Sequence, residues 1–168
     1  MCAIWHAHIH KGNQMKLGAN VLLSVLLLSN ASFVIASNEA HYFPGIFIGY
    51  THASDETHFT YGLEFEYKFN QNWGLGAVYE NIDDAHHGDG VTVTVASLFY
   101  HPSNNVRLGL GVGKEKIGGA HPHTEDLYRL TASYDYHIGH FGLAPTLAVD
   151  FIDGEKAYVF GVALIRPF

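Results

Sequence analysis

Hydrophobic and polar residues alternate with a period of two through most of the chain after residue 40. In the clearest run, every second residue from Phe59 to Phe69 is aromatic or leucine, whereas Glu64, Glu66 and Lys68 lie between them. A period of two places successive side chains on opposite faces of a β-strand, whereas a helix needs a period of about 3.6. The pattern therefore predicts an all-β protein whose strands have one apolar face and one face of small or polar residues.

Turn-forming residues divide this region into eight predicted strands. Their ranges are 41–52, 57–69, 72–82, 90–101, 105–116, 125–137, 141–152 and 155–168. Each is long enough to cross a bilayer, which takes roughly 9–11 residues of a tilted strand. The connections at 70–71, 102–104 and 138–140 are short, whereas those at 82–90 and 117–125 are long and polar. Because an even strand count returns the last strand beside the first, we expect a closed transmembrane antiparallel up-and-down β-barrel.

The alternation also assigns individual residues to faces. Leu108 and Leu130 are predicted to face lipid, so arginine at either position is expected to cost about 2–4 kcal/mol near the membrane midplane. Gly109 is predicted to face the interior, where serine is expected to have a mild effect. The run 91–100 has no assigned faces, because its valines share a face with Ser97.

The composition indicates a surface that is only partly in contact with water. The chain is 48% hydrophobic and 14% aromatic but only 15% charged, where a soluble domain has about 25% charged residues. The net charge of −7 argues against a nucleic-acid partner, because phosphate binding needs a basic surface. The single cysteine, Cys2, precedes a predicted export signal, so no disulfide is expected in the exported protein.

Residues 1–36 are predicted to direct export and to form no part of the barrel. From Met15, a lysine is followed by an apolar stretch over 21–28 and by small residues up to Ala36, which is the plan of a Sec-type signal peptide. The apolar stretch is shorter than the about 20 residues of a transmembrane helix. We therefore expect translation to start at Met15, cleavage after Ala36, and a barrel domain over 37–168.

The last predicted strand carries a further pattern, with large apolar residues on one face and a terminal phenylalanine. The residues of this pattern are Tyr158, Phe160, Val162, Leu164 and Phe168. It resembles the C-terminal assembly signal of outer-membrane β-barrels, and the mature chain is similar to the small eight-stranded OmpA-like and Opa-like barrels. Arg166 departs from that signal, which usually has an aromatic or aliphatic residue there.

This resemblance implies a location and partners. It implies a monomer in a Gram-negative outer membrane, in contact with lipid and lipopolysaccharide and inserted by the barrel-assembly machinery. It implies little about activity, because one fold supports many functions.

Ionisable residues on the predicted inward faces form the first candidate site. They are Glu64, Glu66, Lys68, Glu80, Arg107, Glu115, Arg129, Asp135 and Asp150. The interior of an eight-stranded barrel is just wide enough for side chains to fill it, so buried charges there must pair. We interpret these residues as a salt-bridge network that fills the lumen. The alternative is a narrow polar path that the excess of acids makes selective for cations.

Histidines in the two long predicted loops form the second candidate site. They are His86, His87, His121 and His123. Imidazoles beside loop carboxylates suit Zn, Cu or Ni, so a surface metal site is one interpretation. The spacing matches no recognised ligand motif, and the alternative is a solvated loop whose charge depends on pH.

An enzymatic role rests on His101, Ser103 and Asn104, which resemble the His-x-Ser-Asn motif of lipid A deacylases, with Glu115 as a third candidate. His101 and Ser103 lie at a short predicted turn, whereas Glu115 lies near the other end of the next strand, roughly 30 Å away. Catalytic groups must approach to about 3 Å. We therefore expect a non-enzymatic protein without a cofactor, with a structural or surface-interaction role.

Overall fold

The computed structural model describes residues 41–83, 85 and 90–168, so the predicted signal segment lies outside the described part. Its strands in chain order are β1 (Tyr42–Ala53), β2 (Glu56–Lys68), β3 (Trp73–Ile82), β4 (Val91–Ser103), β5 (Val106–Ile117), β6 (His123–Tyr134), β7 (Tyr136–Ile138), β8 (Phe141–Ile152) and β9 (Glu155–Ile165). Among the described residues, no helix is long and apolar enough to cross a membrane.

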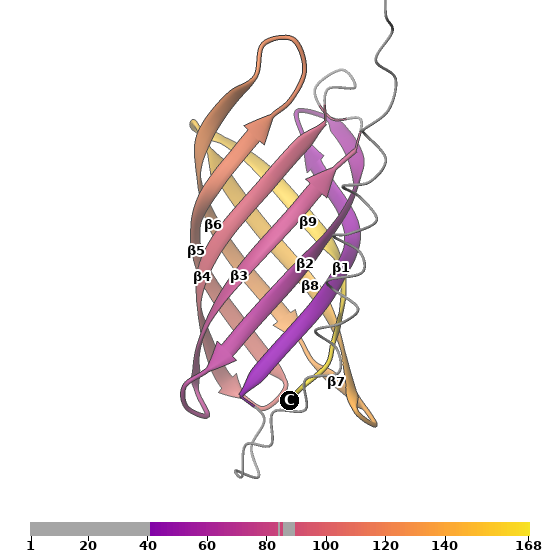
Figure 1. The fold of residues 1–168 in the computed structure, drawn as a ribbon, viewed down its shortest axis with the longest axis vertical. Coiled ribbons are helices and arrows are strands. Elements are labelled where there is room, and N and C mark those ends of the chain that lie inside the picture. Colours follow the sequence, from indigo (N-terminus) through magenta and orange to yellow (C-terminus); the bar gives the residue numbers. More distant parts are fainter. Residues whose placement is uncertain (1–40, 84, 86–89) are drawn as a thin grey trace, which may run out of the picture. The chain divides into compact units, whose positions relative to one another are not determined.

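The strands close into an antiparallel barrel (Figure 1). Neighbouring strands pair in sequence order, and β1 also pairs with β9. Strands β6 and β7 both pair with β8 in one continuous register and together form one side of the barrel. They are separated at Asp135, whose backbone N–H donates to the Asn105 carbonyl (2.6 Å) in the turn between β4 and β5. The prediction of a closed eight-stranded barrel is therefore confirmed.

Most strand boundaries lie close to the predicted ones, and the last strand differs at its end. Strand β9 stops at Ile165, where the sequence predicts a strand up to Phe168. The physical reason is Pro167, which has no N–H to donate to the sheet. The backbone N–H groups of Arg166 and Phe168 still donate to the carbonyls of Pro44 and Tyr42, both at 2.9 Å.

The two ends of the barrel differ in their connections. The end that carries Tyr42 and the C-terminus, here the termini end, has the short turns 69–72, 104–105 and 139–140. The opposite end, here the far end, has the long connections 83–90 and 118–122, and β5 and β6 extend beyond the other strands there (Figure 1).

Two further connections at the far end are tight turns and not long loops. They are the two-residue turns Ser54–Asp55 and Asp153–Gly154, with φ of 48° and 67° in the first and 46° and 83° in the second. Positive φ at both central residues is typical of the type I′ hairpin turn, which suits the twist of antiparallel strands. Long loops therefore occupy only two of the four far-end connections.

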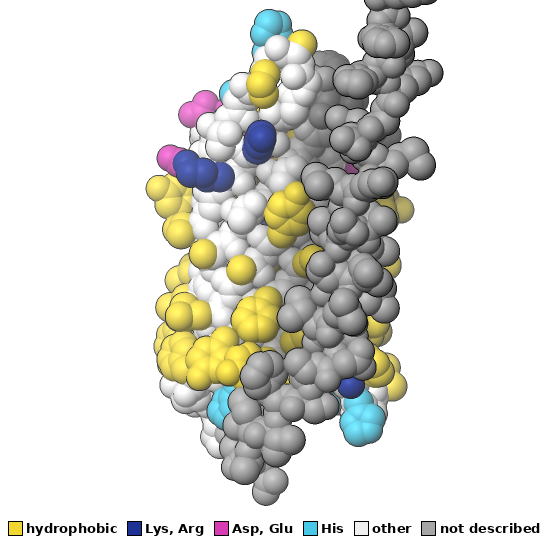
Figure 2. All heavy atoms as spheres, in the orientation of Figure 1, with side chains coloured by type: hydrophobic (Ala, Val, Ile, Leu, Met, Phe, Trp, Pro, Cys, Tyr) yellow, Lys and Arg dark blue, Asp and Glu magenta, His cyan; other side chains and the backbone are white. Residues whose placement is uncertain are grey.

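Large apolar side chains cover the outside of the barrel. Leu108 and Leu130 are 43% and 48% exposed, as the alternation predicts. On the face that Figure 2 shows, hydrophobic side chains are scattered over the middle and gather in a band near the termini end, and the acidic side chains in view lie toward the far end. In water such a surface would aggregate, so it indicates a lipid environment.

Strand β4 is the strand whose faces the sequence left unassigned. Its valines 91, 93 and 95, with Ser97 and Phe99, are buried inside the barrel, whereas Thr94, Leu98 and Tyr100 are exposed outside. The large Phe99 fits here because both neighbouring strands carry glycine opposite it, Gly74 on β3 and Gly109 on β5. A Cβ added at Gly76 would lie 2.5 Å from the Phe99 ring. Apolar residues thus fill part of a lumen for which the sequence predicts small and polar side chains.

The same packing changes the expectation for Gly109. A Cβ at Gly109 would lie 2.8 Å from Phe99 Cε1 and 3.3 Å from Thr131 Cβ, whereas a Cβ at the inward-facing Gly142 would approach no atom closer than 3.7 Å. We therefore expect Gly109→Ser to lower the free energy of unfolding by about 1–3 kcal/mol through overpacking, and Gly142→Ser to have a smaller effect. Urea titration of the refolded variants measures both; a larger loss at Gly142 would contradict this packing.

Candidate functional site

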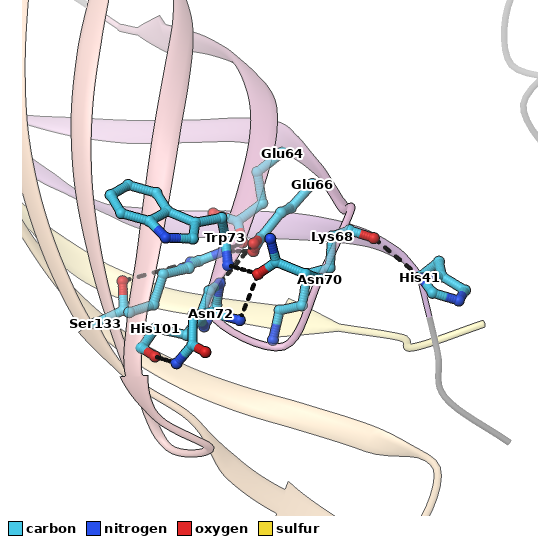
Figure 3. A network of polar contacts seen from close by, with 10 residues as sticks. His41, Glu64, Glu66, Lys68, Asn70, Asn72, Trp73, His101 and Ser133 are labelled. Carbon is cyan, nitrogen blue, oxygen red and sulfur yellow. Dashed lines mark hydrogen bonds and ion pairs between the residues drawn. The ribbon is translucent and has the colours of Figure 1, made fainter.

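Five side chains in the half of the lumen toward the termini end form the Arg107 group: Glu64, Glu66, His101, Arg107 and Ser133 (Figure 3). Both terminal nitrogens of Arg107 donate to Glu64 Oε1 at 3.0 Å, and Nη1 lies 3.5 Å from Glu66 Oε2. His101 Nε2 donates to Glu66 Oε1 at 2.6 Å. One guanidinium therefore lies between two carboxylates, and His101 donates a further hydrogen bond to the second of them, Glu66.

Two other predicted members lie beside this group without joining its hydrogen bonds. Lys68 is half-buried, and its Nζ lies 4.5 Å from the centre of the Phe43 ring. Asp135 is half-buried, and its Oδ1 has no hydrogen-bond partner among the described residues. The sequence identified both as inward charges but did not specify their contacts.

Three buried side chains nearer the far end form the Arg129 group: Glu80, Arg129 and Asp150. Arg129 donates to both oxygens of Asp150, from Nε at 2.6 Å and from Nη2 at 2.7 Å. The same Nη2 donates to Glu80 Oε2 at 2.7 Å. Two carboxylates therefore share one guanidinium, which leaves this layer of the lumen with an excess negative charge.

Little free space is left between these groups. A cavity of about 20 Å³ lies between them, lined by residues such as Phe47, Phe99 and Ala148. One water molecule needs roughly 10–15 Å³ measured in this way, so the space holds about one. Toward the far end, buried Val93, Leu127 and other apolar residues continue the filling.

Glu115 lies apart from both groups. It is 8% exposed and lines a cavity at the far end. In the β5–β6 register it lies directly opposite Glu125, so two carboxylates face each other across the strands. Glu115 has no hydrogen bond or ion pair with another described residue.

Only half of the candidate metal site falls in the described part of the chain. His86 and His87 lie outside it. His123 Nε2 lies 3.4 Å from Glu125 Oε1, and its Nδ1 lies 3.3 Å from the carbonyl of His121. Among the described residues, no group of three or more His, Cys, Asp or Glu side chains is arranged to hold a metal ion.

The candidate triad is not assembled. His101 points into the lumen and pairs with Glu66, whereas Ser103 is exposed at the end of β4. Glu115 pairs in register with Val93, eight residues along β4 from His101, which corresponds to about 26 Å. Sequence reasoning placed His101 at a turn and missed its role in the lumen. His101 shares a face of β4 with Phe99, and only the structure shows that this face points inward.

The closed barrel, its apolar exterior and its filled lumen define the class of the protein as a small transmembrane β-barrel of eight strands. No protein-family model and no curated protein matches the sequence. The chain is, however, similar to several solved structures.

Three of these are barrels from bacteria. The N-terminal β-barrel domain of Pseudomonas aeruginosa OprF matches with a TM-score of 0.60 and 14% identity, covering 78% of this chain and 100% of that one. Neisserial surface protein A matches with a TM-score of 0.56 and 9% identity, covering 76% and 96%. The Yersinia pestis outer membrane protein Ail, in a phospholipid bilayer nanodisc, matches with a TM-score of 0.52 and 14% identity, covering 75% and 99%. At these identities the similarity concerns the fold.

Proposed function

We propose that the protein is a non-enzymatic outer-membrane β-barrel whose body is structural and whose far-end loops meet molecules outside the cell. The observation that carries the proposal is the exposed apolar exterior, with large side chains such as Ile46, Leu110 and Leu147 between 57% and 66% exposed. Only contact with lipid makes such a surface favourable over the whole circumference of a barrel.

Aromatic side chains gather toward both edges of this surface. Near the termini end, the rings of Trp73 and Tyr100 lie 4.8 Å apart. Near the far end, Tyr50 lies 6.0 Å from Phe160. Tyr42 and Tyr50 are eight residues apart on β1, or roughly 20 Å along the axis of a tilted strand. Two aromatic girdles at this spacing are typical of outer-membrane barrels. The short turns at the termini end support an orientation in which that end faces the periplasm, because outer-membrane barrels have short periplasmic turns and longer outer loops.

Two measurements test this proposal. The protein is expected to partition with outer membranes and to migrate faster in gels before heating than after it, because a folded barrel is compact and resists detergent. In planar bilayers the refolded protein is expected to give no steady conductance, because side chains fill the lumen. Recovery of a folded, soluble periplasmic protein would contradict the barrel assignment, and steady cation-selective conductance would favour the narrow-path alternative.

The metal site stays a second, separate proposal. It rests on the position of His121 and His123 at the same end as the connection that contains His86 and His87. Zinc titration at about pH 7.5 and about pH 5.5 tests it, because protonated imidazole does not bind metal. Equal binding by wild type and by a variant with His121→Ala and His123→Ala would identify the histidines as solvated loop residues.

A further inference from the structure

A cavity of about 240 Å³ lies inside the far end of the barrel, next to the apolar filling of the lumen. Buried side chains from four strands form its apolar wall: Ile82, Val91, Ile117 and Ile152. The cavity is about twelve times as large as the 20 Å³ space between the two charge groups. It is large enough for a small organic molecule and much larger than a bare metal ion needs.

Glu115 places a buried carboxyl group on the wall of this cavity. It is 8% exposed, faces the cavity, and has no hydrogen bond or ion pair with a described residue. The nearest guanidinium inside the barrel, that of Arg129, is already shared between Glu80 and Asp150. A buried carboxylate without a partner is costly, so either a proton or a cation in the cavity neutralises it.

Glu125 adds a second carboxylate at the same level of the barrel. It lies directly opposite Glu115 in the β5–β6 register, and like charges in that position destabilise a sheet. Its described partner is His123, at 3.4 Å. An ammonium group between the two carboxylates would convert this repulsion into attraction.

The remaining charged groups on the cavity wall do not supply that cation. Asp153 and Glu155 are acidic, and Glu155 accepts a long hydrogen bond from Ser54 at 3.5 Å. Lys156 is the one lysine or arginine among the described lining residues, and its Nζ lies 5.7 Å from the centre of the Phe151 ring. Beside its apolar residues, the described lining therefore has four carboxyl groups against one lysine, with His58 and His123 as further titratable side chains.

We propose that this cavity binds a small organic cation, with its ammonium group between Glu115 and Glu125 and its apolar part against Ile152. A protonated aliphatic or alicyclic amine has the required chemistry. A divalent metal ion fits less well, because the described residues contain no metal-binding cluster and much of the wall is apolar. This goes beyond the proposed outer-membrane role and does not depend on which side of the membrane the far end faces.

The experiment titrates cyclohexylamine, and cyclohexanol as its neutral analogue, into the full chain folded in a nonionic detergent. Amide chemical shifts of Glu115 and of the lining residue Ala157 report occupancy of the cavity. The amine is expected to give saturable shifts at these residues, and cyclohexanol is expected to bind at least tenfold more weakly. Glu115→Gln, which keeps the shape and removes the charge, is expected to weaken amine binding by about ten- to hundredfold.

A matched control removes one carboxylate outside the cavity. Asp126 lies one residue after Glu125 and pairs with Lys114 on the outside of the barrel at 2.8 Å, so Asp126→Asn should leave amine binding unchanged. If Glu115→Gln does not fold, as shown by its gel migration, Glu125→Gln carries the same prediction. Equal binding of cyclohexanol, unchanged affinity in both glutamine variants, the same shifts with calcium alone, or no saturable shift would each overturn the proposal. Gel migration of the wild type tests the barrel assignment separately.

Discussion

Replacing Arg129 by methionine is expected to lower the free energy of unfolding by about 3–5 kcal/mol. The substitution keeps much of the side-chain length but removes the guanidinium that Glu80 and Asp150 share at 2.6–2.7 Å. Both carboxylates then lie inside the barrel without a cation, at 3% and 2% residue exposure. Urea titration of the refolded variant, followed by gel migration, measures the loss.

Two controls separate this effect from a general response to lost charge. Lys114→Met breaks the Lys114–Asp126 pair, whose side chains are 67% and 75% exposed, and is expected to cost less than about 1 kcal/mol. Combining Arg129→Met with Glu80→Gln and Asp150→Asn removes the uncompensated charges and is expected to recover a large part of the stability. A loss in Arg129→Met no larger than that in Lys114→Met would contradict the buried network.

Arginine at Leu130 is expected to lower the free energy of unfolding by about 2–4 kcal/mol, because it places a charge in the hydrocarbon core of the membrane. Leu130 is exposed on the outside of β6, directly opposite Leu110 on β5, which in turn lies opposite Leu98 on β4. This row of leucines lies near the middle of the strands, where charge is least tolerated. Unfolding from lipid bilayers measures the effect, because detergent micelles adapt around a charged side chain.

The matched control is arginine at Thr94. Thr94 also faces outward, and it lies opposite Lys114, four residues along β5 from Leu110 toward the far end. Near the membrane interface an added arginine is expected to cost only about 0–1 kcal/mol. Equal losses at the two positions would show that the leucine row does not lie in the membrane core.

The sequence predicted the lipid-facing surface well because each strand carries its own pattern. In the run from Phe59 to Phe69 the alternation is complete, and every large apolar residue in it is exposed in the barrel. Which face of a strand meets lipid depends on the period of two and on the polarity of the opposite face. Both are local properties that need no knowledge of neighbouring strands.

Strand β4 shows where this local reasoning failed. Its inward Phe99 is large and apolar, and its outward Thr94 is polar, which reverses the usual pattern of the class. The reversal is favourable because Phe99 occupies space above Gly76 and Gly109 of the adjacent strands. The fit between a ring on one strand and glycines on two others cannot be read from any one segment.

For the lumenal charges, the sequence predicted which residues face inward but not which of them pair. The sequence named the inward residues, but Arg107 contacts Glu64 across 43 positions and Arg129 contacts Glu80 across 49 positions. It also treated Glu115 as one more member of the network, whereas the structure leaves it apart, facing Glu125. His101, which sequence reasoning placed in a turn, completes the Arg107 group.

The sequence by itself therefore determined the strands, the lipid-facing side of strands other than β4, and the closure of the barrel, because these follow from periodicity and from an even count of antiparallel strands. The tertiary structure alone decided which charges meet inside, which position remains without a partner, and where apolar residues fill the lumen. These depend on the register of each strand pair, since a shift of one residue turns every side chain of a strand to the opposite face. The cavity beside Glu115 is a consequence of that register.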